Sequence, residues 1–286
     1  MSSPAQHWVA NARMYSVSTT AAAAWSELLS RVARRARLPL QMLDYPAPAP
    51  LAELWARPDK AAVFMCGLPF TRAQPRPHLL AAPVPSPPEF RGQPLYWSEF
   101  VVRSNSPHRS LSDTFGQRIA FTSPESQSGF AAPLRHLRTA GGPRPLFLEV
   151  IAPQMTPQGA LAAVAEGRAD VAAIDSYSLH LLRRYAPELV GRIRVVDRTE
   201  PRPIPPLVAS SALDSLAQAL VEAQHDAALQ PLLADLRLHR FVRAEPAAYE
   251  CLLGEFESSL DYWRTRPLAL DVHPVFRGLT PKAGAE

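Results

Sequence analysis

Residues 126–129 carry the strongest local chemical signal in the sequence. They follow a predicted strand over residues 118–122 and begin a predicted helix that extends to about Thr139. The first N–H groups of a helix have no partner within it and carry partial positive charge. Serine hydroxyls can donate beside them, and a glycine lets a ligand approach the backbone. We therefore predict a pocket for a phosphate or carboxylate, with simple N-capping by serine as the alternative. The residues concerned are Ser126, Gln127, Ser128 and Gly129.

The ends of other predicted strands carry side chains that could complete a ligand site. Ligands of parallel sheets bind beyond the carboxyl ends of the strands. If two α/β blocks face each other, these strand ends line one cleft. Asp175 could instead cap the turn that follows it, and the tyrosines could be ordinary core residues. The strand ends supply Tyr15, Gly67 beside Cys66, Tyr96, Asp175 and Tyr177.

The sequence contains none of the common catalytic signatures. Nucleophile-elbow, phosphate-loop, dinucleotide-binding and zinc-protease motifs do not occur. Cys66 has no histidine at a spacing that suggests a nucleophile–base pair, and a small buried hydrophobic role is the simpler interpretation. We predict no catalytic residue, no metal and no cofactor. The helical histidines lack metal-binding spacing and comprise His136, His180, His225 and His239.

Composition and charge narrow the class of protein further. With 286 residues, 47% of them hydrophobic and 20% charged, the chain can fold as two globular domains. The formal net charge is +4, nearly all basic residues are arginine, and no run of five basic residues occurs. A nucleic-acid interface is therefore not indicated. Two cysteines, Cys66 and Cys251, are too few for a disulfide scaffold.

The N-terminal residues 1–17 have no basic segment followed by an apolar core and a small-residue cleavage site. No secretory signal is therefore visible. A cytoplasmic protein and a protein whose leader has been removed both remain open.

Alternating strand and helix patterns predict an α/β fold with parallel sheets. The proline-rich segment 81–88 is predicted to be an extended connection that cannot form a helix or an inner strand, and residues 201–206 are predicted to be a second rigid connection. Helices near the C terminus are predicted to cover the first block, before a loose tail of twenty residues. The predicted lobes are residues 1–94 with 199–286, and residues 95–198. Predicted strands are 9–17, 40–44, 61–66, 96–103, 118–122, 146–151, 171–175 and 193–196; predicted helices are 19–37, 48–57, 110–113, 126–139, 157–166, 179–185, 211–224, 227–236 and 246–263.

Three ordered blocks resemble a known family. They are residues 96–107 (YWSEFVVRSNSP), 110–130 (SLSDTFGQRIAFTSPESQSGF) and 160–176 (ALAAVAEGRADVAAIDS), with weaker similarity at 11–17 and 66–70. The chain resembles the periplasmic phosphonate, phosphite and phosphate-binding components of ABC importers, which have the type II periplasmic-binding-protein fold. The resemblance implies two lobes, each a mainly parallel sheet flanked by helices, that close on a small oxyanion. It also implies a monomer, a periplasmic location and an ABC permease as partner.

The resemblance also assigns roles to individual residues. Residues 126–129 would contact the oxyanion, and Tyr96 would border it. Gln127 replaces the usual threonine of a Ser-Thr-Ser-Gly loop, and Pro157 stands where a histidine is usual. Acids that hold an ammonium group in some members are replaced by Tyr177 and Pro205. These departures favour a plain phosphate-like ligand, or an organic anion outside the family norm.

Two functions other than ligand binding remain open for this sequence. An enzyme of cofactor biosynthesis on the same fold would need a titratable cleft, with Asp175, Glu149, Cys66 and His136 as candidates. An interaction module could act through residues 81–88 and 201–206, although those prolines more simply stiffen connections between domains.

Overall fold

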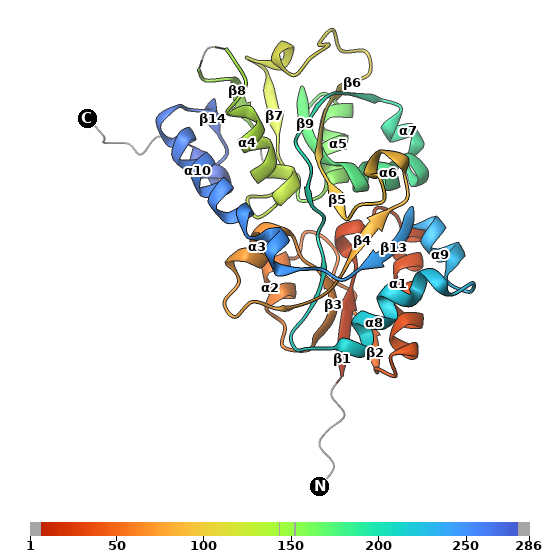
Figure 1. Cartoon of the computed structure of the whole chain (residues 1–286). Helices are drawn as coiled ribbons and strands as arrows, with labels where there is room; N and C mark the ends of the chain where they lie inside the picture. Colours follow the sequence, from red (N-terminus) through yellow and green to blue (C-terminus); the bar gives the residue numbers. More distant parts are fainter. Residues whose placement is uncertain (1–6, 143, 152, 280–286) are drawn as a thin grey trace. The chain divides into compact units, whose positions relative to one another are not determined.

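The computed structural model describes residues 7–142, 144–151 and 153–279, drawn in Figure 1. The chain divides into two compact units, Met1–Leu95 with Pro203–Glu250 (unit 1) and Tyr96–Arg202 with Cys251–Glu286 (unit 2). The chain therefore passes from one unit to the other three times. Two of these passages run through the short strands β5 (Leu95–Tyr96) and β11 (Arg202–Pro203), which pair with each other.

Unit 1 contains a six-stranded sheet with the strand order β13-β4-β12-β3-β1-β2. Strand β1 pairs in parallel with β2 and β3, whereas the pairs that involve β12 and β4 are antiparallel. The sheet is thus mixed, rather than mainly parallel as predicted. Its elements are β1 (Trp8–Asn11), α1 (Thr19–Arg35), β2 (Leu40–Met42), α2 (Leu51–Ala56), β3 (Lys60–Phe64), α3 (Gly67–Arg72), β4 (His78–Pro85), β12 (Leu207–Ala209), α8 (Asp214–Glu222), α9 (Gln230–Asp235) and β13 (Leu238–Val242).

Helix α1 follows the predicted amphipathic pattern. Trp25, Leu28 and Val32 recur at helical spacing and are completely buried. The helix begins at Thr19, as predicted, and the side chain of Ser18 caps it by accepting a hydrogen bond from the Ala21 N–H. The basic residues at its end, Arg34 and Arg35, lie where cations favour the helix dipole.

The prediction of an extended connection at residues 81–88 is wrong for residues 81–85, which belong to strand β4 (His78–Pro85). Strand β4 lies between β12 and β13 in the sheet. Its first half, up to Ala81, pairs with β12, and its second half, from Ala82, pairs with β13. Pro83 and Pro85 fall in the half that pairs on one side only. Proline lacks an N–H, so the chain accommodates it where a second partner strand is not present.

Unit 2 contains a second six-stranded sheet with the strand order β10-β6-β9-β7-β8-β14. Strands β9, β7, β8 and β14 run parallel to one another, whereas β6 is antiparallel to both β9 and β10. Its elements are β6 (Ser98–Arg103), β7 (Arg118–Ala120), α4 (Ala132–Leu137), β8 (Phe147–Val150), α5 (Pro157–Ala165), β9 (Val171–Asp175), α6 (Ser176–Tyr185), α7 (Pro187–Val190), β10 (Ile193–Arg198), α10 (Cys251–Thr265) and β14 (Ala269–Val272).

The C-terminal segment belongs to unit 2, not to the first lobe as the sequence suggested. Strand β14 lies in the predicted loose tail and pairs in parallel with β8. Helix α10 lies beside α4, as Figure 1 shows in blue and green, and the Trp263 indole N–H donates to the Leu134 carbonyl at 3.0 Å. An ordered strand partner and a buried tryptophan therefore attach residues 251–272 to unit 2.

No helix in the described part of the chain combines the length and apolar character needed to cross a membrane.

Candidate functional site

The predicted anion loop forms a π-helical turn, η4 (Gln127–Ala131), with Ser126 as its N-cap. The Ser126 hydroxyl oxygen accepts a hydrogen bond from the Gly129 N–H at 2.9 Å. The capping alternative is therefore realised at Ser126, but a hydroxyl that accepts can still donate its own proton. The N–H groups of Gln127 and Ser128 donate no hydrogen bond within the described chain. The turn thus offers backbone and hydroxyl donors at a helix start.

Gly129 has a packing role that sequence reasoning did not anticipate. A Cβ at this position would lie 1.9 Å from the Thr122 hydroxyl oxygen and 2.8 Å from the Thr122 Cβ. The Gly129 carbonyl also accepts a hydrogen bond from the Thr122 N–H at 3.2 Å. Glycine at this position therefore lets Thr122, two residues after the end of β7, pack closely against the turn.

Replacement of Gly129 by alanine should lower the free energy of unfolding by about 1–3 kcal/mol, because the Thr122 Cβ is fixed to the backbone and cannot swing away. Gly254→Ala is the matched control, since nothing lies within 4 Å of the added Cβ in helix α10. That control should raise stability by about 0.5–1 kcal/mol. Urea denaturation measures both, and equal stability of the two variants would contradict the packing role.

Ser128 lies between two strand ends of unit 2. Its carbonyl accepts a hydrogen bond from the Ser98 hydroxyl at 2.6 Å, and its own hydroxyl donates to the Asp175 carboxylate at 3.4 Å. Ser98 and Asp175 are partners in the β6–β9 register. The sheet therefore brings together two predicted site residues, Ser128 and Asp175, that are 47 positions apart in the sequence.

Asp175 is both a cap and a neighbour of the anion loop. Its carboxylate accepts a hydrogen bond from the Ser178 N–H at 2.6 Å at the start of α6. Burial raises the pKa of Asp175 to about 6, and the hydrogen bonds from Ser178 and Ser128 offset only part of this effect. The acid that lies against Ser128 therefore takes up its proton near pH 6 and is mostly ionised at pH 7.5.

The predicted aromatic residues are buried. Tyr96 and Tyr177 belong to unit 2, and burial raises the pKa of Tyr177 well above its ordinary value. Tyr15 belongs to the core of unit 1, where its ring makes an edge contact with Phe64 at 5.0 Å. Gly67, the first residue of α3, is also buried in unit 1.

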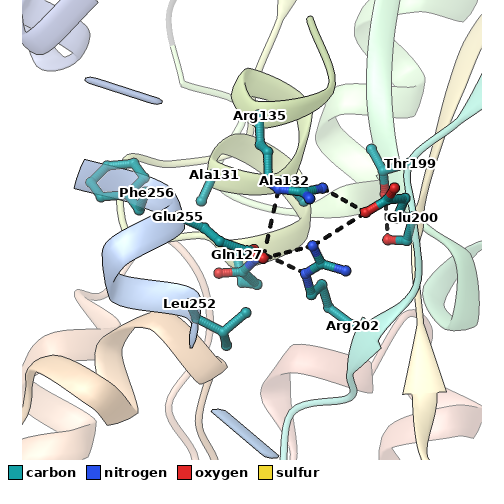
Figure 2. Close-up of a pocket in the computed structure, with 10 residues that line it drawn as sticks. All are labelled: Gln127, Ala131, Ala132, Arg135, Thr199, Glu200, Arg202, Leu252, Glu255 and Phe256. Atoms are coloured by element: carbon teal, nitrogen blue, oxygen red, sulfur yellow. Dashed lines mark hydrogen bonds and ion pairs between the residues drawn. The ribbon is translucent and has the colours of Figure 1, made fainter. Parts of the chain in front are cut away.

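Gln127 faces a different environment from Ser128. Figure 2 shows its side chain beside a ring of charged residues from α4, the segment after β10, and α10. They enclose a cavity of about 10 Å³, which is room for about one water molecule. The Gln127 amide oxygen is buried and has no hydrogen-bond partner among the described residues. The cavity is lined by Gln127, Ala131, Ala132, Arg135, Thr199, Glu200, Arg202, Leu252, Glu255 and Phe256.

Two arginines and two glutamates form a closed ion-pair network beside Gln127 (Figure 2). Arg202 contacts both carboxylate oxygens of Glu255, at 2.7 and 2.9 Å, and Glu200 at 3.3 Å. Arg135 pairs with Glu200 at 2.8 Å and with Glu255 at 3.6 Å. The hydrogen bond from Arg135 lowers the pKa of Glu200. Sequence reasoning missed this network because its members come from three distant segments.

Loss of the Glu255 charge should destabilise unit 2. Glu255→Gln leaves the half-buried Arg202 without its bidentate partner, so the free energy of unfolding should fall by about 1–2 kcal/mol. Glu166→Gln breaks a pair with Arg168 in which both side chains are 51% exposed, and it should have almost no effect. Chemical denaturation measures the stability of both variants. Equal stability of Glu255→Gln and Glu166→Gln would argue against this role.

The candidates for an enzyme do not form one cluster. His136 pairs with Asp197 at 2.9 Å, whereas Cys66 is a buried free thiol in unit 1. Glu149 lies on strand β8. Among the residues that the structure describes, no group of three or more His, Cys, Asp or Glu side chains is placed to hold a metal ion.

Comparisons with known proteins agree on one family. The family model described as "ABC transporter, phosphonate, periplasmic substrate-binding protein" matches residues 16–249, which is most of the chain. No curated protein sequence matches significantly.

Solved structures share the fold at low sequence identity. A binding protein component of an ABC phosphonate transporter from Pseudomonas aeruginosa has a TM-score of 0.71 and 20% identity, and covers 90% of this chain and 87% of that one. PhnD1 from Prochlorococcus marinus, solved with methylphosphonate, has a TM-score of 0.73 and 17% identity over 89% and 98% of the two chains. A Xanthomonas citri protein bound to chloride has a TM-score of 0.65 and 20% identity over 90% and 99%.

These likenesses confirm the predicted α/β fold of type II periplasmic binding proteins. The enzyme alternative receives no support from them, since the family consists of transport components. The match over residues 16–249 establishes that this chain belongs to the phosphonate family of periplasmic substrate-binding proteins of ABC transporters.

Proposed function

We propose that the turn at residues 126–131 of unit 2 binds a small oxyanion of the phosphonate, phosphite or phosphate class. The observation that carries this proposal is the set of donors at the start of η4. The Gln127 and Ser128 N–H groups have no acceptor within the described chain, and the Ser126 hydroxyl can donate beside them. Such a helix start favours a negatively charged group.

Asp175 adds a selectivity element to the same turn. A carboxylate so close to Ser128 repels a fully charged dianion but can accept a hydrogen bond from a ligand oxygen that retains a proton. Phosphate, phosphite and alkyl phosphonates have such protonated forms, whereas sulfate is fully deprotonated near neutral pH. The proposed site therefore prefers protonated phosphorus oxyanions to sulfate.

Family membership supports a role in transport without catalysis. In this role the chain delivers its oxyanion to the permease of an ABC transporter, in the periplasm. The similarity to PhnD1, which was solved with methylphosphonate, supports the ligand class.

Isothermal titration calorimetry of the full chain with phosphate, phosphite, methylphosphonate and sulfate tests the proposal. We expect saturable binding of at least one phosphorus oxyanion and at least tenfold weaker binding of sulfate. Absence of binding to all three phosphorus oxyanions, or equal affinity for sulfate, would refute the proposed ligand class.

A further inference from the structure

Three arginines of unit 2 surround one tyrosine beyond the C-terminal end of α4. The Arg138 guanidinium carbon lies 5.3 Å from the centre of the Tyr262 ring, and that of Arg266 lies 4.8 Å from it. Arg144 donates a hydrogen bond to the Tyr262 hydroxyl at 3.2 Å. The three cations come from the end of α4, the segment before β8 and the segment just after α10.

The charge of this group is not balanced by acids. Among the described residues, no carboxylate forms an ion pair with Arg138, Arg144 or Arg266. Their hydrogen bonds go to neutral oxygens, which are Ser258 Oγ for Arg138, the Ala140 carbonyl and Tyr262 Oη for Arg144, and Thr265 Oγ1 for Arg266.

Two further details show a local excess of cationic donors over acceptors. One terminal nitrogen of Arg144, Nη1, is buried and has no hydrogen-bond acceptor in the described chain. The Arg144 guanidinium lies 5.2 Å from the centre of the Trp263 ring, a weaker compensation than a carboxylate gives. The hydrogen bond from Arg144 and the charges of Arg144, Arg266 and Arg138 lower the pKa of Tyr262.

A hollow of ligand size adjoins one of these cations, Arg138, and the Tyr262 side chain that the other two contact. Its volume is about 370 Å³, within the range of about 300–1,000 Å³ that small-molecule sites occupy. The charge of Arg135 on its wall is matched by Glu200, and His136 faces Asp197, so the excess charge comes from Arg138. Thr139 and Tyr262 add hydroxyl groups. The hollow is lined by Arg135, His136, Arg138, Thr139, Glu200 and Tyr262.

We propose that the hollow bordered by Arg138, Thr139 and Tyr262, together with Arg144 and Arg266, binds a second anion that carries two or more phosphate or carboxylate groups. Arg138 borders the hollow directly, whereas Arg144 and Arg266 add positive charge around the same tyrosine. A guanidinium group suits phosphate and carboxylate because it offers a planar fork of donors. This site lies beyond the end of α4, whereas the turn η4 lies at its start, and it requires no closure of the protein around the ligand.

Calorimetry of the full chain with inorganic tripolyphosphate and with citrate, at about 50 mM salt, tests this proposal. We expect at least one of these probes to bind, and Arg138→Gln with Arg266→Gln to weaken its binding at least tenfold. The control is Arg264→Gln, which removes a cation from α10 that already pairs with Asp261 and should leave the affinity within about twofold. Binding of neither probe, or equal affinity of the double variant and Arg264→Gln, would overturn the proposal.

The two anion sites can be told apart. A variant with Ser126→Ala and Ser128→Ala should keep its affinity for the tripolyphosphate or citrate that binds, even where it loses phosphonate binding. Loss of the probe in that variant would place it at η4 and overturn the second site. As a further readout, the bound probe should raise the pKa of Tyr262, observed as reduced tyrosinate absorbance in alkaline solution. The Tyr262→Phe variant should lack this change, and an unchanged signal from the wild type would count against the site.

Discussion

Replacement of both Ser126 and Ser128 by alanine should weaken binding of the phosphorus oxyanion by about 100-fold. The Ser126 hydroxyl can donate one hydrogen bond to the charged ligand, and the Ser128 hydroxyl can donate another when it turns away from the Asp175 carboxylate; such a bond contributes roughly 1.5–3 kcal/mol. Two lost bonds thus amount to about 3 kcal/mol, since each 1.4 kcal/mol corresponds to about a tenfold change in affinity. Calorimetry with the phosphorus oxyanion that the wild type binds best measures the effect.

A matched pair of variants separates ligand contact from stability. Ser126→Ala also removes the cap on the Gly129 N–H, at a cost of about 1 kcal/mol in the free energy of unfolding. Ser110→Ala with Ser112→Ala removes two exposed hydroxyls from another segment of unit 2 and should leave the affinity unchanged. The unfolding midpoint of each variant must confirm a folded protein at the assay temperature. Wild-type affinity in a folded Ser126 and Ser128 double variant would contradict the site.

Replacement of Asp175 by asparagine should stabilise the protein at pH 7.5 by up to about 3 kcal/mol. The pKa of Asp175 is about 6 in the folded chain, against 3.8 as its ordinary value, because the carboxyl group is buried. The folded state therefore binds the proton more tightly than the unfolded state, and stability falls as the pH rises from about 4 through 6. Above pH 6 the whole penalty is present. Asparagine cannot ionise, yet it can still cap α6.

The pH profile of unfolding checks this prediction. The stability difference between Asp175→Asn and the wild type should be large at pH 7.5 and vanish near pH 4. Asp170→Asn is a control of opposite sign. Burial alone would raise the pKa of Asp170, but its hydrogen bonds with Arg118 outweigh burial and lower that pKa. Asp170→Asn should therefore lose stability at pH 7.5. If the stability of Asp175→Asn varied with pH as that of the wild type does, the predicted effect of burial on Asp175 would be disproved.

The same substitution bears on the ligand. An oxyanion held at Ser128 would lie next to the Asp175 carboxylate, so removal of that negative charge should strengthen the binding of fully charged sulfate at pH 7.5 by several-fold and reduce the preference for phosphorus oxyanions. Both ligands are compared at one pH in the variant and in the wild type. Unchanged discrimination against sulfate in Asp175→Asn would contradict the proposed role of the Asp175 charge.

Corrections to the sequence-based fold have a common cause. The prolines of β4 argued against an inner strand, but the sequence does not reveal that two different neighbours share the two halves of this strand. Strand β14 lies in a stretch that has no strong strand pattern of its own and is ordered by pairing with β8. Both features depend on which strands become neighbours, and composition and periodicity do not specify this.

The residues of the candidate site likewise divide into those that the local sequence reveals and those that only folding brings together. Ser126 and Gly129 were identified from the sequence, because a strand, a short loop and a helix start are local features. The reason for glycine at position 129 was not, since the Thr122 side chain occupies the space that a Cβ would need. The placement of Gln127 beside Arg135, Arg202 and Glu255 likewise arises from segments that only folding brings together.

The amino-acid sequence alone determined the α/β alternation, the donor-rich turn and the resemblance to phosphonate-binding proteins, because hydrogen bonding and side-chain periodicity act over a few residues. Only the tertiary structure decided that Asp175 meets Ser128, that the C-terminal strand completes the sheet of unit 2, and that three unbalanced arginines surround Tyr262. Those contacts join residues that lie far apart in the chain, and strand order and helix packing, rather than local preference, select them.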